Sequence, residues 1–160
     1  MVERLSEQII KGLDAGLYHL AFYVALTLPD IAGAIDDGTK AKNGDRYKKW
    51  FDSYAAEYFS WNWQPESWTL TGDECWRLRC GILHQGTTEY ALYALLSDEP
   101  VVSTGIYPRQ DEPSILDVDQ FCRHMVRAFY DWIEEKESSF EFEKLEINEV
   151  SKGEWKFKFN

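Results

Sequence analysis

The strongest constraint on the fold is a helical repeat of apolar residues close to the N-terminus. They recur at spacings of three and four, at Leu5, Ile9, Leu13, Leu17, Leu20, Val24 and Leu28. This spacing places them on one side of an α-helix, so we expect a helix over Glu3–Leu28 with one buried stripe. Proline suits a first helical turn but cannot extend an existing helix. A short second helix at a new angle is therefore expected over Pro29–Ile35, followed by a polar loop over Asp36–Gly44.

The same periodicity predicts three further helices, each with its own start signal. Asp45 can cap a helix whose aromatic residues we interpret as core, namely Tyr47, Trp50, Phe51, Tyr54 and Tyr58. Thr71 and Glu74 have the spacing of a capping box that begins a helix, and Gly86 is a natural C-terminal stop for that helix. Asp117 or Asp119 can cap a long helix with an apolar stripe formed by Phe121, Met125, Phe129, Trp132 and Ile133.

Strands are expected in the rest of the chain. β-branched and aromatic residues over Glu89–Leu96 and Val101–Tyr107 predict two short strands or an extended excursion within residues 88–107. Alternating residues in the tail predict a hairpin over residues 139–160. The segment Phe59–Trp68 lacks a regular period and is expected to be an aromatic loop that covers the bundle. We prefer buried packing for its tryptophans over a platform for stacking RNA bases.

These elements predict a mainly α fold, with a helical domain over residues 1–138 and the hairpin appended to the same domain. A chain of 160 residues is one domain's worth, and its formal net charge of −11 opposes non-specific attraction to nucleic acid. Three cysteines without a CxxC pair argue against a disulfide framework and against a zinc site. The longest apolar stretch, Leu17–Leu28, is too short to span a bilayer. We expect a cytoplasmic protein with no metal, cofactor or membrane association.

Only three histidines can supply imidazole chemistry, and they differ in setting. His19 and His124 lie within helical stripes and are interpreted as structural. His84 comes at a predicted helix end, five residues after Arg79. A helix C-terminus favours a cationic imidazole, and arginine grips phosphate oxygens through two donors. Together they are the minimum equipment for cleaving RNA without a metal: a proton-transfer group and a cation for the phosphate.

The spacing of this pair raises a geometric difficulty. Five steps of about 100° place Arg79 and His84 about 140° apart on an ideal α-helix. Arg77, seven residues before His84, is the better aligned neighbour. The pair therefore requires a break near Gly81, a long reach by Arg79, or a second copy of the chain.

The segment Arg79-Cys80-Gly81-Ile82-Leu83-His84-Gln85-Gly86 resembles the Arg-x4-6-His signature of the HEPN superfamily (higher eukaryotes and prokaryotes nucleotide-binding domains). The resemblance extends to a long N-terminal helix and to three later segments, Leu26–Ile31, the Arg46-Tyr47-x-x-Trp50 helix and the Phe121…Trp132 helix. The C-terminal hairpin lies outside it. The family fold is an up-and-down helical bundle.

Many HEPN proteins are metal-independent endoribonucleases of toxin–antitoxin and defence systems, and active members usually dimerise so that two motifs share a cleft. The resemblance thus implies an endoribonuclease acting at a composite homodimer site, with RNA as substrate and an antitoxin protein among its partners. His84 would be the acid–base residue, Arg79 the phosphate-binding residue and Arg77 an auxiliary phosphate-binding residue.

The alternative hypothesis is a non-catalytic HEPN-like binding or dimerisation module. The acidic net charge favours it, and so does Cys80. The position after the motif arginine is usually polar in active members, whereas cysteine is a weak hydrogen-bonding group. The intact Arg79 and His84 favour the enzyme.

Overall fold

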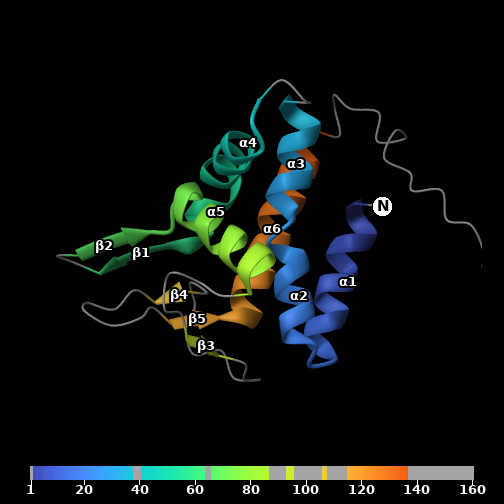
Figure 1. Cartoon of the computed structure of the whole chain (residues 1–160), viewed down its shortest axis with the longest axis vertical. Helices are drawn as coiled ribbons and strands as arrows, with labels where there is room; N and C mark the ends of the chain where they lie inside the picture. The colour runs from blue at the N-terminus through green and yellow to red at the C-terminus, as the bar shows by residue number, and fades with distance from the viewer. Residues whose placement is uncertain are drawn as a thin grey trace, which may run out of the picture.

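The computed structural model shows a mainly α protein, as predicted (Figure 1). It describes residues 2–37, 41–63, 66–86, 93–95, 106–107 and 115–136. Helix α1 (Val2–Asp14) packs beside α2 (Tyr18–Ala25), and α3 (Leu28–Asp37) continues α2 in one column (Figure 1). Helix α6 (Val118–Lys136) runs along this column. The hairpin predicted over residues 139–160 lies outside the described residues.

The single helix expected over Glu3–Leu28 is wrong, because the chain reverses direction between α1 and α2. Gly16 adopts φ 72°, a left-handed conformation that ends the first helix. Ile9 and Leu13 are buried before this turn, whereas Leu17 and Leu20 are 53% and 60% exposed after it. The apolar repeat thus crosses a break that periodicity does not reveal. The predicted second helix is present as α3, but the new angle expected at Pro29 is wrong, because α3 continues α2 in one column (Figure 1). Helix α3 extends to Asp37 and so shortens the expected polar loop.

The predicted aromatic helix is present, but it starts and ends differently. Helix α4 (Asn43–Trp50) follows Lys42, and no side chain caps its first turn, so the predicted cap at Asp45 is wrong. Asp45 lies within that first turn, where a carboxylate still suits the helix dipole. A π-helical turn, η1 (Phe51–Ala55), and a 3-10 turn, η2 (Ala56–Phe59), continue the segment. The core interpretation holds for Tyr47, Trp50 and Phe51, which are buried, while Tyr54 and Tyr58 pack at its edge.

The aromatic loop predicted over Phe59–Trp68 is a hairpin instead. Strands β1 (Ser60–Trp63) and β2 (Glu66–Thr69) pair antiparallel, with Trp61 opposite Trp68. In Figure 1 this hairpin projects from the bundle. Polar and aromatic residues do alternate along β1 (Ser60–Trp63), but the alternation covers only four residues and does not stand out within the longer aromatic segment.

Short strands occur within residues 88–107, as predicted, and their pairing involves a third strand that the sequence analysis missed. Strand β5 (Ile115–Asp117) lies between β3 (Tyr93–Leu95) and β4 (Ile106–Tyr107), parallel to the first and antiparallel to the second. Helix α6 begins directly after β5. Asp117 accepts a hydrogen bond from the Gln120 amide at 3.0 Å, which selects Asp117 over Asp119 as the cap.

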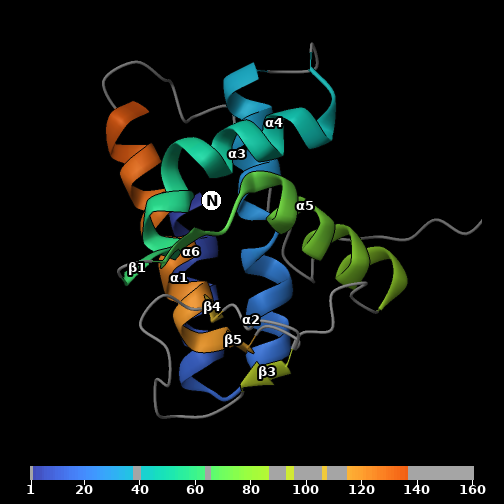
Figure 2. The ribbon, with the colours of Figure 1, turned by 90° about the vertical axis from the view of Figure 1, so that its left-hand side faces the viewer.

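Two close helix approaches fix the elements that carry the candidate site. A Cβ at Gly33 would lie 3.0 Å from the Arg46 backbone oxygen, so α3 and α4 are in close contact. A Cβ at Gly72 would lie 2.5 Å from the Lys48 backbone oxygen, so α4 also touches α5 (Gly72–Cys80). The order α3, α4, α5 is therefore held by backbone contacts, with α5 extending to one side of the α2–α3 column (Figure 2).

Candidate functional site

The helix that carries the candidate site has the two end signals that the sequence predicts. The Thr71 side chain accepts from the Glu74 amide, and the Glu74 carboxylate accepts from the Thr71 amide at 2.8 Å, completing the capping box. At the other end Gly86 adopts φ 66°, which a residue with a side chain rarely does. Both predictions are confirmed.

A π-helical turn, η3 (Gly81–Gln85), lies between α5 and Gly86 and brings the two motif residues together. Nη1 of Arg79 lies 2.7 Å from Nε2 of His84. A π turn is wider than an α turn and is closed by hydrogen bonds between residues five apart, so it aligns side chains at that spacing. Ideal helix geometry required a break near Gly81, a long reach by Arg79 or a second copy of the chain, and the π-helical turn supplies the break. One chain is sufficient to form the contact.

The chemistry of arginine fixes the proton on His84 in this arrangement. A guanidinium group has donors only, so Nη1 donates and Nε2 of His84 accepts. The imidazole is then neutral, with its proton on Nδ1. His84 itself is exposed, so a ligand can reach it from solvent. The arrangement presents a neutral base held beside a fixed cation.

Asp30, in the first turn of α3, is a third member of the site that the sequence analysis did not identify. Nε of Arg79 donates to Oδ2 of Asp30 at 3.0 Å, and the two side chains are only 17% and 24% exposed. Burial raises the pKa of Asp30, and the charge and hydrogen bond of Arg79 oppose that increase. No local signal marks Asp30 as a partner, because it lies 49 positions from Arg79.

Aromatic packing completes the surroundings of Arg79. Its guanidinium carbon lies 5.1 Å from the centre of the Trp76 ring, within the range of a cation–π contact. Trp76 in turn lies 5.2 Å from the Tyr47 ring. The Tyr47 hydroxyl is 3.3 Å from the Cys75 sulfur, and burial raises the pKa of both groups, that of Cys75 to about 12. Arg79 thus packs on one side against the aromatic pair formed by Trp76 and Tyr47.

The remaining sequence candidates lie apart from this contact. Arg77 pairs with Asp73 at 2.6 Å and is 57% exposed, so its auxiliary role stays a prediction. His19 is exposed on α2. His124 stacks against Tyr58, with ring centroids 5.9 Å apart. His84 is the histidine that lies against Arg79.

The described residues contain no cluster of three or more histidine, cysteine or acidic residues able to hold a metal ion. One helical segment among them, Tyr18–Asp37, is long and apolar enough to cross a bilayer. Ala25 and Leu28 of this segment are fully buried against the bundle, and the core helix of a soluble protein meets the same criteria.

Comparisons of the chain with protein-family models, with curated proteins and with solved structures give no match. The resemblance to the HEPN superfamily therefore stays a prediction. The class that the structure itself defines is a mainly α protein with an arginine, a histidine and a half-buried carboxylate in contact at a helix end.

Proposed function

We propose that the protein is a metal-independent endoribonuclease of the HEPN type, located in the cytoplasm, with Arg79 and His84 as its catalytic residues. The observation that carries the proposal is the 2.7 Å contact between Arg79 Nη1 and His84 Nε2. It holds a proton acceptor beside a group suited to binding phosphate oxygens.

The proposed reaction is attack of a ribose 2′-hydroxyl on the adjacent phosphorus. His84 Nε2 takes the hydroxyl proton, the new P–O2′ bond forms and the P–O5′ bond breaks. The products are a 2′,3′-cyclic phosphate and a 5′-hydroxyl. Arg79 stabilises the phosphate oxygens that gain charge in the transition state. Nε2 must first be released by Arg79, and a phosphate oxygen that accepts from Nη1 provides this release.

A homodimer remains part of the proposal for a chemical reason. The leaving 5′ oxygen needs a proton, and the His84 that acts as base does not yet hold one when attack begins. In the composite arrangement that the resemblance implies, a second copy of the chain supplies the acid through a protonated His84, which therefore no longer accepts from its own Arg79. The same resemblance favours a role in a toxin–antitoxin or defence system, with an antitoxin protein as partner.

The second candidate function is a non-catalytic binding or dimerisation module, and Asp30 favours it. The Asp30 carboxylate already accepts a hydrogen bond from Nε of Arg79 at 3.0 Å, so a phosphate must compete with Asp30 for this donor. The half-buried Cys80, next to Arg79, provides only a weak hydrogen-bonding group. In this alternative the Asp30–Arg79 pair fastens α3 to α5 and has no substrate.

Cleavage assays in EDTA distinguish the two functions. Purified wild type and the His84→Ala variant are incubated with assorted RNAs, and fragments are resolved on gels. The His19→Ala variant is the matched control, since it removes another exposed imidazole. We expect cleavage by wild type and by His19→Ala, with a loss of about 100-fold or more in His84→Ala. Wild type that leaves every RNA intact, or His84→Ala that cleaves equally well, would rule out the proposal.

A further inference from the structure

A polar cavity lies apart from the Arg79–His84 contact, between α3, α4, η1 and α6. Its volume is about 230 Å³. Charged walls come from Asp36 and Asp37 of α3, Arg46 and Lys49 of α4, and Lys136 of α6. Sites for drug-sized molecules usually occupy about 300 Å³ or more, so this cavity suits a smaller molecule or a single functional group.

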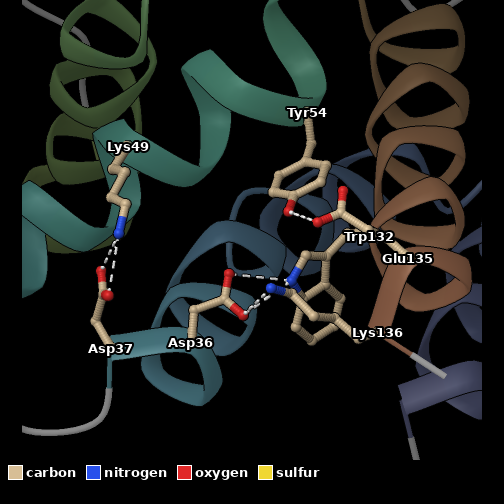
Figure 3. Close-up of polar contacts among 7 residues, drawn as sticks. All are labelled: Asp36, Asp37, Lys49, Tyr54, Trp132, Glu135 and Lys136. Carbon is tan, nitrogen blue, oxygen red and sulfur yellow. Dashed lines mark hydrogen bonds and ion pairs between the residues drawn. The ribbon is translucent and has the colours of Figure 1, made fainter. Parts of the chain in front are cut away.

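The carboxylates around this cavity already accept hydrogen bonds from the protein (Figure 3). The Trp132 indole donates to both oxygens of Asp36, at 3.2 and 3.1 Å, and Lys136 lies 3.4 Å from the same carboxylate. Lys49 donates to both oxygens of Asp37 at 3.1 Å. These contacts join α3 to α4 and α6. The two carboxylates are consequently poor sites for a cationic ligand.

One buried donor at the cavity, in contrast, has no acceptor. Trp50 lines the cavity and is 2% exposed, and its indole N–H has no hydrogen-bond acceptor among the described residues. Each lysine has three N–H donors, and Ser53, which also lines the cavity, carries a hydroxyl group. Three cationic and two anionic side chains give the lining a net charge of +1, in a chain whose net charge is −11.

We propose that this cavity binds a small oxyanion, that is, the phosphate or carboxylate group of a small molecule. Lys49 and Lys136 bind the anionic oxygens, and the Trp50 indole donates to one of them. An anion supplies the acceptor that the buried indole lacks and matches the positive lining. This cavity is separate from the proposed endoribonuclease site at Arg79 and His84, so the oxyanion proposal and the endoribonuclease proposal can be tested independently.

The test follows the indole N–H signals of the ¹⁵N-labelled full-length protein by NMR. The Trp50 signal is assigned as the one lost in Trp50→Phe. Inorganic phosphate and acetate are titrated separately, each against sodium chloride at the same ionic strength. We expect saturable movement of the Trp50 signal with at least one oxyanion and none with chloride. Movement with phosphate alone assigns the phosphate class, and movement with acetate alone assigns the carboxylate class.

Lysine variants establish where the anion binds. The double variant Lys49→Gln/Lys136→Gln should bind about tenfold more weakly or worse, because two charged donors are lost. Lys11→Gln, at an exposed lysine of α1, is the matched control and should bind as wild type does. His84→Ala should also bind normally. The proposal is overturned if no oxyanion moves the Trp50 signal, if chloride has the same effect, or if the folded double variant binds with wild-type affinity.

Discussion

Replacing Gly72 by alanine should weaken the fold and the site together, because Gly72 is where α5 meets the backbone of α4. The added Cβ would lie 2.5 Å from the Lys48 backbone oxygen and 2.8 Å from the Lys48 Cα, whereas ordinary contacts begin at 3.4 Å. Backbone atoms cannot rotate away as a flexible side chain does, so α5 must move by roughly 0.9 Å. The same shift stretches the 2.6 Å hydrogen bond from the Gly72 amide to Asp52.

The expected free-energy change combines two opposing effects. Overpacking of this kind typically destabilises a protein by about 1–3 kcal/mol. Alanine also restricts the unfolded chain more than glycine does, which returns about 0.4–1 kcal/mol. The net loss should be about 1–2 kcal/mol, or about 2–8 °C in Tm for a chain of this length.

The control for this substitution is Gly12→Ala in α1. A Cβ there would lie 3.5 Å from the Ala21 Cβ, an ordinary contact, so the higher helix propensity of alanine should leave stability unchanged or raised by about 1 kcal/mol. Urea unfolding and thermal melts of both variants measure the difference. A Gly72→Ala variant as stable as Gly12→Ala would refute the proposed close approach of α4 and α5. If the protein cleaves RNA, a displacement of Arg79 by about 1 Å should also slow cleavage by up to about 100-fold.

Three further predictions concern the site and its supporting helix. Thr71→Ala should lower the free energy of unfolding by about 1 kcal/mol, because the capping box is lost, and an unchanged urea midpoint would contradict this. Burial raises the pKa of Asp30. At a pH between the unfolded and the folded pKa, the Asp30 carboxyl therefore keeps a proton in the folded protein that it has lost in the unfolded chain. The stability of wild type relative to Asp30→Asn should therefore fall as pH rises from about 4 to 7, and a constant difference in urea unfolding would contradict the shift. A thiol reagent at about pH 8 should modify Cys80 in the folded protein and should reach the other two cysteines only after unfolding. The reason is that Cys75 and Cys122 are fully buried and their pKa values are raised. Rapid labelling of all three thiols in the folded protein would contradict this burial.

Sequence reasoning succeeded where the determining interactions are local. The capping box at Thr71, the stop at Gly86 and the stripe of α6 each depend on residues within a few positions, and all three are confirmed. It failed at Gly16, since apolar spacing continues across the turn and only the exposure of Leu17 and Leu20 shows that their stripe is not buried. The β1–β2 hairpin was missed because the alternation in β1 covers only four residues, Ser60–Trp63, which is too short to separate from the surrounding aromatic residues.

The same distinction between local and long-range interactions decides which parts of the candidate site could be predicted from the sequence. The Arg79–His84 pair could be proposed from the sequence, and the break at Gly81 was one of the options that helix geometry allowed. The π turn itself could not be predicted, because no residue from Gly81 to Gln85 requires it. Asp30 could not be assigned either, because its contact with Arg79 depends on the packing of α3, α4 and α5 through Gly33 and Gly72.

We propose that Arg79 and His84 catalyse attack by an RNA 2′-hydroxyl. The most direct measurement uses two copies of one cleaved RNA in EDTA, of which one carries a single 2′-deoxy nucleotide on the 5′ side of the cut. We expect the unmodified RNA to yield a 2′,3′-cyclic phosphate and a 5′-hydroxyl, detected by mass spectrometry, and the 2′-deoxy RNA to stay intact at that position. Equal cleavage of both RNAs, or products with a 5′-phosphate, would contradict it.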